Sequence, residues 1–227
     1  MEKIKKFLAE REKVSAFDEK PKYWLALYVP VYLILFFTVE HLVTENYYVS
    51  WIPLDDKIPF CEYFVVFYSM WYPLLFAAGF YLMFTDGKRF NRYMYFLAVG
   101  FTASLVFCLI FPNGQDLRPD PMPRQNFFTW LLGRIYAADT NTNVIPSMHV
   151  IGCFAASAGL LSSPNAKRWI GWGSVALGLI ICASTVLVKQ HSILDVFIAI
   201  IVCVPLYLII FRPFAERKRK YGTSRRM

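Results

Sequence analysis

Charged side chains are scarce in this chain. Of its 227 residues only 18% are charged, whereas 57% are hydrophobic and 18% are aromatic, and the mean hydropathy is +0.41. An ordinary soluble domain carries about 25% charged residues, so the composition excludes one. A lipid bilayer is the expected solvent, and a single membrane domain fits this length at about 20 residues per span.

The sequence also lacks the cysteine spacing of a disulfide framework and the features of a cleavable signal peptide. Four of the five cysteines lie inside apolar runs and Cys61 lies at the edge of another, so we expect packing residues and not a disulfide framework. The N-terminal segment holds seven basic and five acidic residues before Tyr23, with no early apolar run. We therefore expect no cleaved signal peptide.

Six apolar runs are long enough to cross a bilayer, and the sequence predicts an all-α bundle of six transmembrane helices. An N-terminal segment, residues 1–22, precedes the predicted membrane catalytic domain, 23–211, and a basic tail, 212–227, follows it. The six runs are Tyr23 to Leu42, Tyr63 to Phe84, Tyr93 to Phe111, Pro146 to Leu161, Trp169 to Leu187 and Ile193 to Phe211.

Basic residues are distributed unevenly between the two ends of this predicted bundle. Nineteen of the twenty-four Lys and Arg residues fall in the N-terminal segment, the 88–92 loop, the 167–168 loop and the C-terminal tail. The positive-inside rule then predicts cytoplasmic termini and a site near the outer face, and we expect an integral protein of the plasma membrane. Topology explains the net charge of +8, so no nucleic-acid partner is expected.

The longest outward connection, residues 112–145, contains apolar residues at one-helix-face spacing. They predict a short interfacial helix between the third and fourth membrane helices. A lid that packs on the bundle only for stability would have the same spacing, so both interpretations stay open. The residues are Phe127, Phe128, Leu131, Leu132, Ile135 and Tyr136.

A histidine and a carboxylate at the start of the sixth run are the strongest candidates for chemistry. His191 and Asp195 are four residues apart, so on a helix they share one face. A carboxylate in an apolar helix needs a partner, and by accepting a hydrogen bond from imidazole it leaves the other ring nitrogen free as a nucleophile or base. A buried pair that only caps the helix is the structural alternative.

A second group of candidates surrounds the start of the fourth run, where Pro146 suits the first position of a helix. The backbone amides that follow, together with the Ser147 hydroxyl, form an anion site that fits phosphate. His149 adds a titratable group at the same depth, although a structural histidine is the alternative. In the outward loop, Arg118 offers a guanidinium fork that matches phosphate oxygens. All these groups converge on one face of the predicted bundle.

The motifs resemble those of the type 2 phosphatidic acid phosphatase superfamily. Its pattern is K-x6-R-P, then P-S-x-x-H or the compact form P-S-x-H, and then S-R-x5-H-x3-D. Arg118 and Pro119 match the end of the first motif, but Phe111 stands where lysine is usual. The compact second motif is P-S-M-H, which ends at His149.

The third motif of the superfamily is matched at Ser184, His191 and Asp195. Thr185 stands where its arginine is usual. The resemblance covers the six-span plan and about residues 112–196. Residues 54–60 are also similar to the lipid phosphotransferase branch, which includes sphingomyelin and inositol phosphorylceramide synthases.

The resemblance implies a phosphohistidine mechanism that needs no metal ion or other cofactor. His191 would attack phosphorus, Asp195 would orient His191, and His149 would protonate the leaving group and later activate the acceptor. The implied substrate is a lipid phosphate or a phospholipid. The candidate phosphate-binding residues are Arg118, Ser147, Ser184 and Lys189, and Arg124 and Arg134 are further candidate cations.

The departures from the superfamily motifs at Phe111 and Thr185 affect which substrate is expected. A phosphomonoester carries nearly two negative charges and gains from several cations, whereas a phosphodiester carries one, so the loss of lysine and arginine favours a diester or a transferase. A lipid phosphohydrolase is the first hypothesis and a lipid phosphotransferase the alternative. A proton-coupled transporter and a catalytically inactive lipid-binding protein are the hypotheses from other classes.

Overall fold

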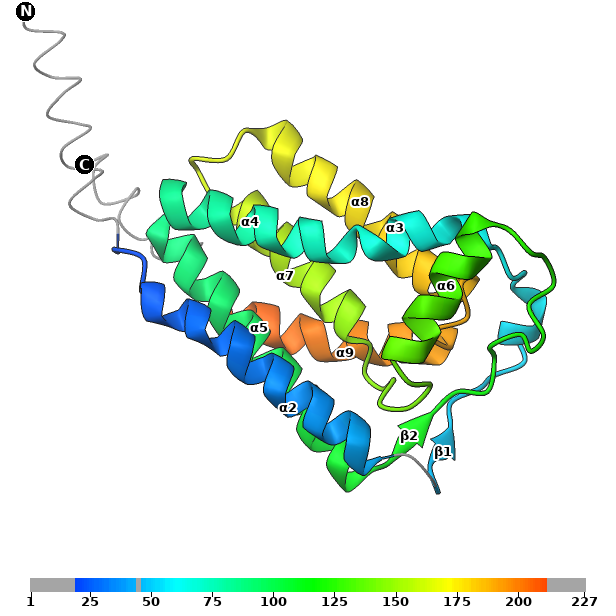
Figure 1. Ribbon diagram of the computed structural model, residues 1–227. Coiled ribbons are helices and arrows are strands. Elements are labelled where there is room, and N and C mark those ends of the chain that lie inside the picture. The colour runs from blue at the N-terminus through cyan, green and yellow to red at the C-terminus, as the bar shows by residue number, and fades with distance from the viewer. Residues whose placement is uncertain (1–18, 44–45, 212–227) are drawn as a thin grey trace, which may run out of the picture.

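The computed structural model describes residues 19–43 and 46–211, and this part of the chain is mostly helical, as predicted (Figure 1). Most of the predicted segment 1–22 and all of the tail 212–227 lie outside the described residues. The helices are η1 Tyr23–Leu27, α2 Tyr28–Leu42, η2 Asp55–Lys57, η3 Glu62–Phe64, α3 Val65–Ser69, α4 Trp71–Thr85, α5 Gly87–Ile110, α6 Phe127–Ala138, α7 Met148–Ser162, α8 Arg168–Leu187 and α9 Ile193–Ile210. The strands are β1 Tyr48–Val49 and β2 Asn113–Gly114.

Five helical segments of the described chain are long and apolar enough to cross a membrane. Their outward faces carry large apolar side chains such as Phe84 and Ile110, which are 75% and 78% exposed. Helices that are apolar on their exposed faces are typical of a membrane protein. The segments are Tyr23–Leu42, Glu62–Thr85, Gly87–Ile110, Arg168–Leu187 and Ile193–Ile210.

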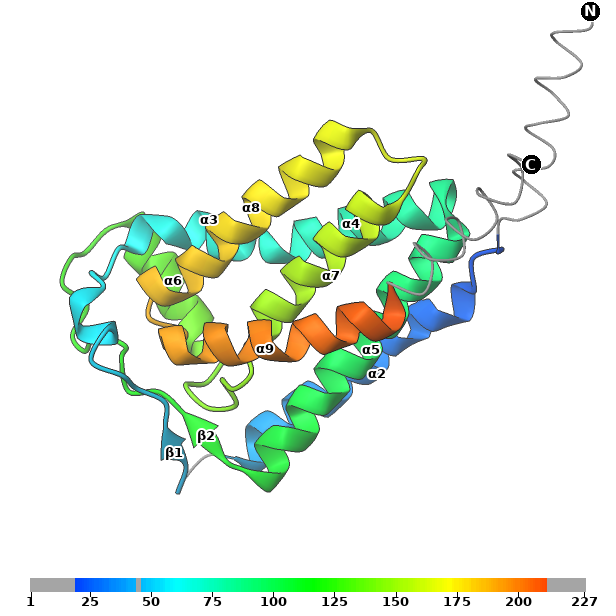
Figure 2. The same cartoon turned by 180° about the vertical axis from the view of Figure 1, so that it is seen from behind.

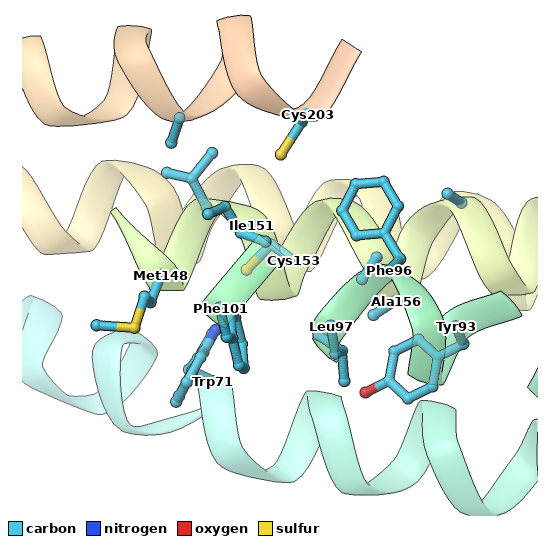
Figure 3. Close-up of a cluster of buried hydrophobic side chains, with 14 of the residues drawn as sticks. Trp71, Tyr93, Phe96, Leu97, Phe101, Met148, Ile151, Cys153, Ala156 and Cys203 are labelled. Carbon is cyan, nitrogen blue, oxygen red and sulfur yellow. The ribbon is translucent and has the colours of Figure 1, made fainter. Parts of the chain in front are cut away.

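Helix α7 coincides with the fourth predicted run but has only 15 residues. It lies at the centre of the bundle, where it packs against α4, α5, α8 and α9 (Figures 1 and 2). Small residues allow this close packing, because a Cβ added at Gly152 would lie 2.7 Å from the Trp71 Nε1 atom. Figure 3 shows Trp71 of α4, Ile151 of α7 and Cys203 of α9 among the buried apolar side chains that meet there.

Connections gather at two opposite ends of the bundle. At one end the Ser163 hydroxyl donates to the Asp86 carboxylate over 2.8 Å, and Arg92 donates to the Phe211 carbonyl over 3.2 Å. At the other end β1 pairs in parallel with β2, with Tyr48 opposite Asn113, and α6 lies nearby (Figure 1). The starts of α7 and α9 therefore share one end with the longest loops.

Candidate functional site

The start of α9 brings His191 and Asp195 together. The His191 Nδ1 atom lies 3.1 Å from one oxygen of the fully buried Asp195 carboxylate. The same oxygen accepts a hydrogen bond from the Ser192 backbone amide over 3.0 Å, and the other oxygen accepts one from the Ser50 hydroxyl. The carboxylate thus caps the helix and also fixes the imidazole, so the two interpretations of the pair are not exclusive.

His149 lies in the first turn of α7 and faces His191. The His191 Nε2 atom is 3.4 Å from the His149 Nδ1 atom, although 41 residues separate the two positions in the sequence. The rings of Tyr68 and Trp71 flank the His149 ring, each with its centroid 4.6 Å away. Both histidines line a cavity of about 250 Å³ at this end of the bundle.

The segment before α7 is held by Asn113, which follows α5. Its side-chain oxygen accepts hydrogen bonds from the Val144 and Ile145 amides over 3.0 and 2.7 Å. Ser147 follows at the N-cap of α7, and its buried hydroxyl has no hydrogen-bond partner within the described part of the chain. An unpaired hydroxyl beside a helix N-terminus suits an anion, but Ser147 does not line the cavity in this conformation.

Arg118 lies outside the histidine cavity and closes the end of α6. Its guanidinium donates to the carbonyls of Tyr136, Asp139 and Thr140 over 3.1, 2.8 and 2.5 Å, and to the Gln190 side-chain oxygen. The Tyr136 carbonyl is one of the acceptors that a helix leaves unpaired at its C-terminus, and the other two carbonyls lie at and just after the C-cap of α6. Burial lowers the pKa of the Arg118 side chain, with the Asp139 charge acting in the opposite direction.

Lys189 and Ser184 also lie outside the cavity. The Lys189 ammonium donates to the Asp55 and Ile58 carbonyls over 2.9 and 2.7 Å, and burial lowers its pKa. The Ser184 hydroxyl donates to the Ile181 carbonyl within α8 over 2.6 Å. The structure therefore does not place either group, or Arg118, against the histidines.

The two further candidate cations are also distant from the histidines. Arg124 pairs with Glu62, with its Nε atom 2.6 Å from one carboxylate oxygen. Arg134 is an exposed residue of α6. Among the described residues that line the cavity, none is a lysine or an arginine.

Asp55 is a residue of this end of the bundle that the sequence did not single out as a site residue. Its carboxylate accepts hydrogen bonds from the Ser192 hydroxyl over 2.6 Å and the Ile193 amide over 2.8 Å, so it caps α9 from a distant loop. It also accepts one from the Ile52 amide over 2.9 Å, which anchors its own loop. The similarity of residues 54–60 to lipid phosphotransferases was the only sign of this role.

Asp139 is a second residue missed in the sequence, and it lines the histidine cavity. Its carboxylate accepts hydrogen bonds from the Tyr68 hydroxyl over 3.1 Å and the Gln190 amide over 3.2 Å. Burial raises the pKa of the Asp139 carboxyl to about 6, and the charge of Glu40 acts in the same direction. The polar run that follows the predicted surface helix could have indicated it.

We expect Asp55→Ala to weaken both stability and turnover. The change removes two hydrogen bonds at a buried helix start and one within the 52–55 loop, so the free energy of unfolding should fall by about 2 kcal/mol. Since His191 lies just before the start of α9 that Asp55 holds, kcat should fall by about tenfold while KM changes little. Thermal unfolding in detergent and steady-state kinetics measure the two effects.

Asp56→Ala is the matched control. Asp56 is exposed, and its carboxylate accepts a hydrogen bond from the Trp51 indole over 3.0 Å. This change should leave stability and kcat nearly unchanged. Equal losses in the two variants would show that Asp55 has no special part in holding α9.

No family model, no curated protein and no solved structure matches this chain. Within the described residues, no group of three or more His, Cys, Asp and Glu side chains is arranged to hold a metal ion. The histidine pair, the carboxylate behind it and the cavity in front form the candidate site.

Proposed function

We propose that this protein is a membrane-embedded phosphohydrolase that attacks a lipid phosphate ester with His191. The main support for this proposal is a row of three side chains beside one cavity. His191 contacts Asp195 through its Nδ1 atom over 3.1 Å and His149 through its Nε2 atom over 3.4 Å. A carboxylate, an oriented imidazole and a second imidazole form the arrangement of an activated nucleophile with a proton donor.

The geometry supports a two-step reaction. Asp195 accepts a hydrogen bond from the Nδ1–H group of His191, which leaves Nε2 with a free electron pair. Nε2 attacks phosphorus and forms a nitrogen–phosphorus bond as the bond to the leaving oxygen breaks, and the protonated form of His149 gives its extra proton to that oxygen. Water then attacks phosphorus, its proton passes to His149, and the nitrogen–phosphorus bond breaks.

A lipid substrate is favoured by the space around the histidines. The histidine cavity shares Tyr32, Leu33, Trp71 and Tyr72 with a larger apolar groove of about 410 Å³. This groove lies between α2, α4 and α5, three segments apolar enough to contact lipid. A polar head group in the cavity and an acyl chain in the groove would place phosphorus near His191.

In this proposal α7 is the fourth of six membrane helices. Its 15 residues span about 22 Å, less than the hydrocarbon core of about 30 Å, but eleven of them are buried between other helices. A central helix covered by its neighbours need not match the bilayer thickness. We place α6 at the outer membrane surface, where its exposed Phe127 and Trp130 side chains suit the interface.

The same proposal places the termini in the cytoplasm, the site near the outer face of the plasma membrane, and the chain in the type 2 phosphatidic acid phosphatase superfamily. The orientation of the termini and of the site is supported by the positions of the basic residues. Superfamily membership is supported by the shared motifs at His149, His191 and Asp195 and by the contact between their side chains.

A lipid phosphotransferase is the second candidate function. The absence of lysine and arginine from the described cavity wall favours a singly charged phosphodiester over a phosphomonoester. When His191 attacks a phosphodiester, the phosphorylated head group stays on His191. A lipid alcohol could then accept that group in place of water. The acceptor thus decides between the two activities, which share the same first step.

An assay with labelled lipids tests the proposal. Purified protein is incubated with a lipid phosphomonoester and with phosphodiesters of the same acyl chains, with and without a lipid alcohol as acceptor. Release of a water-soluble phosphate product identifies a hydrolase, and transfer of label to the acceptor identifies a transferase. No conversion of any lipid would contradict both functions.

A further inference from the structure

The wall of the histidine cavity is rich in aromatic rings. Tyr68, in α3, and the first two residues of α4 lie on one side, and α2 provides three more rings. The faces of such rings carry partial negative charge and attract cations, above all quaternary ammonium groups. The six residues are Tyr32, Phe36, Phe37, Tyr68, Trp71 and Tyr72.

Asp139 adds a negative charge to this wall. One of its carboxylate oxygens accepts from Tyr68 and Gln190, and for the other no partner is present within the described residues. Arg118 lies close by but bonds to the Asp139 backbone carbonyl and not to its carboxylate. Glu40 is occupied elsewhere, since it accepts hydrogen bonds from Thr140 and Asn143.

Tyr68 lies between the Asp139 carboxylate and the histidines. Its ring packs against His149 and its hydroxyl donates to Asp139, so the carboxylate lies about one tyrosine side chain away from the histidines. A two-carbon amino alcohol esterified to phosphate separates its ammonium from phosphorus by a similar length. A cavity of about 250 Å³ has room for such a head group but not for a whole lipid.

We propose that the cavity selects phospholipids whose head group carries a cationic amine, which Asp139 and the surrounding rings bind while the phosphorus faces His191. The inference rests on the proposed function for the position of the phosphorus. A doubly charged phosphomonoester would instead meet the Asp139 carboxylate without a lysine or arginine on the described wall to offset the repulsion.

The test compares four lipids of identical acyl chains: phosphatidylethanolamine, phosphatidylcholine, phosphatidylglycerol and phosphatidic acid. The wild-type protein should have the higher kcat/KM on the two amine lipids. Asp139→Asn should lower kcat/KM on these by about tenfold, mainly through KM, and leave phosphatidylglycerol unchanged or improved. A preference of the wild type for the anionic lipids, or an equal loss on all four, would overturn the inference.

Asp116→Asn is a closely matched control. Asp116 also accepts hydrogen bonds from a tyrosine hydroxyl, that of Tyr47 over 2.9 Å, and from an amide, that of Asn141 over 3.3 Å. It lies at the same end of the bundle but outside the histidine cavity. This variant should keep the wild-type preference, and an equal change of preference in both variants would contradict a specific part for Asp139.

A pH series gives a second readout. Asp139 faces Tyr68 and Tyr72 from α3 and α4, Glu40 from α2, Arg118, and His191 with Gln190 from the α8–α9 connection. Because the pKa of its carboxyl is raised to about 6, protonation below that pH should remove the preference for amine lipids. The ratio of kcat/KM values on amine and anionic lipids cancels pH effects that are common to all lipids, so it isolates Asp139. A ratio that is constant from pH 5 to 8 would contradict this role.

A binding measurement with a variant that lacks the proposed nucleophile tests the head-group site independently of the proposed chemistry. His191→Asn protein is titrated with short-chain phosphatidylcholine and phosphatidylglycerol below their micelle concentrations, with tryptophan fluorescence as the signal because Trp71 lines the cavity. Tighter binding of phosphatidylcholine that depends on Asp139 supports the head-group site even if no lipid is converted. Equal binding of both lipids contradicts it even if the enzyme is active.

Discussion

His191→Asn is expected to lower kcat by about 10⁴-fold or more on every lipid substrate, because the nucleophile is removed. Asparagine is close to histidine in size and can still donate a hydrogen bond to Asp195, so the start of α9 should remain folded. The measurement is single-turnover conversion of labelled lipid, which detects the chemical step without product release.

The control for this prediction is His41→Asn. His41 is the third histidine of the chain and lies exposed on α2, where its Nδ1 atom is 2.6 Å from the Phe37 carbonyl. Conversion by this variant should equal that of the wild type. If His191→Asn kept more than about a tenth of the wild-type rate with an unchanged unfolding midpoint, His191 would not be the nucleophile.

Asp195→Asn is expected to lower kcat by about 10³-fold with a smaller effect on KM. An amide cannot stabilise the positive charge that His191 gains as it attacks, and it can leave the imidazole in the wrong tautomer. The Ser50 hydroxyl and the Ser192 amide, which both donate to Asp195, would have only one acceptor oxygen left. Steady-state kinetics and thermal unfolding separate the catalytic effect from the structural one.

Asp86→Asn controls for the loss of a buried helix-capping carboxylate. Asp86 caps α5 at the opposite end of the bundle by accepting from the Arg89 amide over 3.1 Å, and it also accepts from Ser163. Both variants should lose stability, but only Asp195→Asn should lose kcat. Equal losses of kcat would mean that Asp195 acts only as a cap.

The helical bundle and its apolar surface follow from the sequence because membrane helices are encoded by long local runs. The predicted Trp169–Leu187 and Ile193–Phe211 runs differ from α8 and α9 by one residue at one end. The contact of His191 with Asp195 is also local, although its cause is not a shared helix face: His191 lies two residues before α9, and the Asp195 carboxylate reaches back past the Ser192 N-cap to meet it. Local spacing is the part of the site that a sequence reveals directly.

The partners of the cations could not be predicted in the same way. Arg118 and Lys189 were expected near phosphate, yet each donates to backbone carbonyls that the fold brings close. A long cationic side chain reaches acceptors in several directions, and the choice among them depends on where distant loops lie. Substituting these two residues would disturb the loops, so it would not by itself identify a phosphate ligand.

Asp55 and Asp139 were missed for a related reason. Asp55 is separated from the Ser192 hydroxyl by 136 intervening residues, and nothing in its own sequence neighbourhood predicts that contact. Asp139 follows α6, and its position against Tyr68 depends on how that helix packs over the bundle. Tertiary contacts of this kind need the fold, whereas the histidine motifs needed only spacing.

Trapping the covalent intermediate tests the central assignment most directly. The protein is mixed briefly with head-group-labelled phospholipid and with labelled lipid phosphomonoester, quenched in base, and digested with trypsin. Cleavage after Lys189 and after Arg217, with the Arg212–Pro213 bond left intact, places His191 in the peptide 190–217, and His149 falls in the separate peptide 135–167. We predict label on phosphorus in the 190–217 peptide alone, absent in His191→Asn protein. Label on the 135–167 peptide, or lipid conversion with neither peptide labelled, would contradict His191 as the nucleophile.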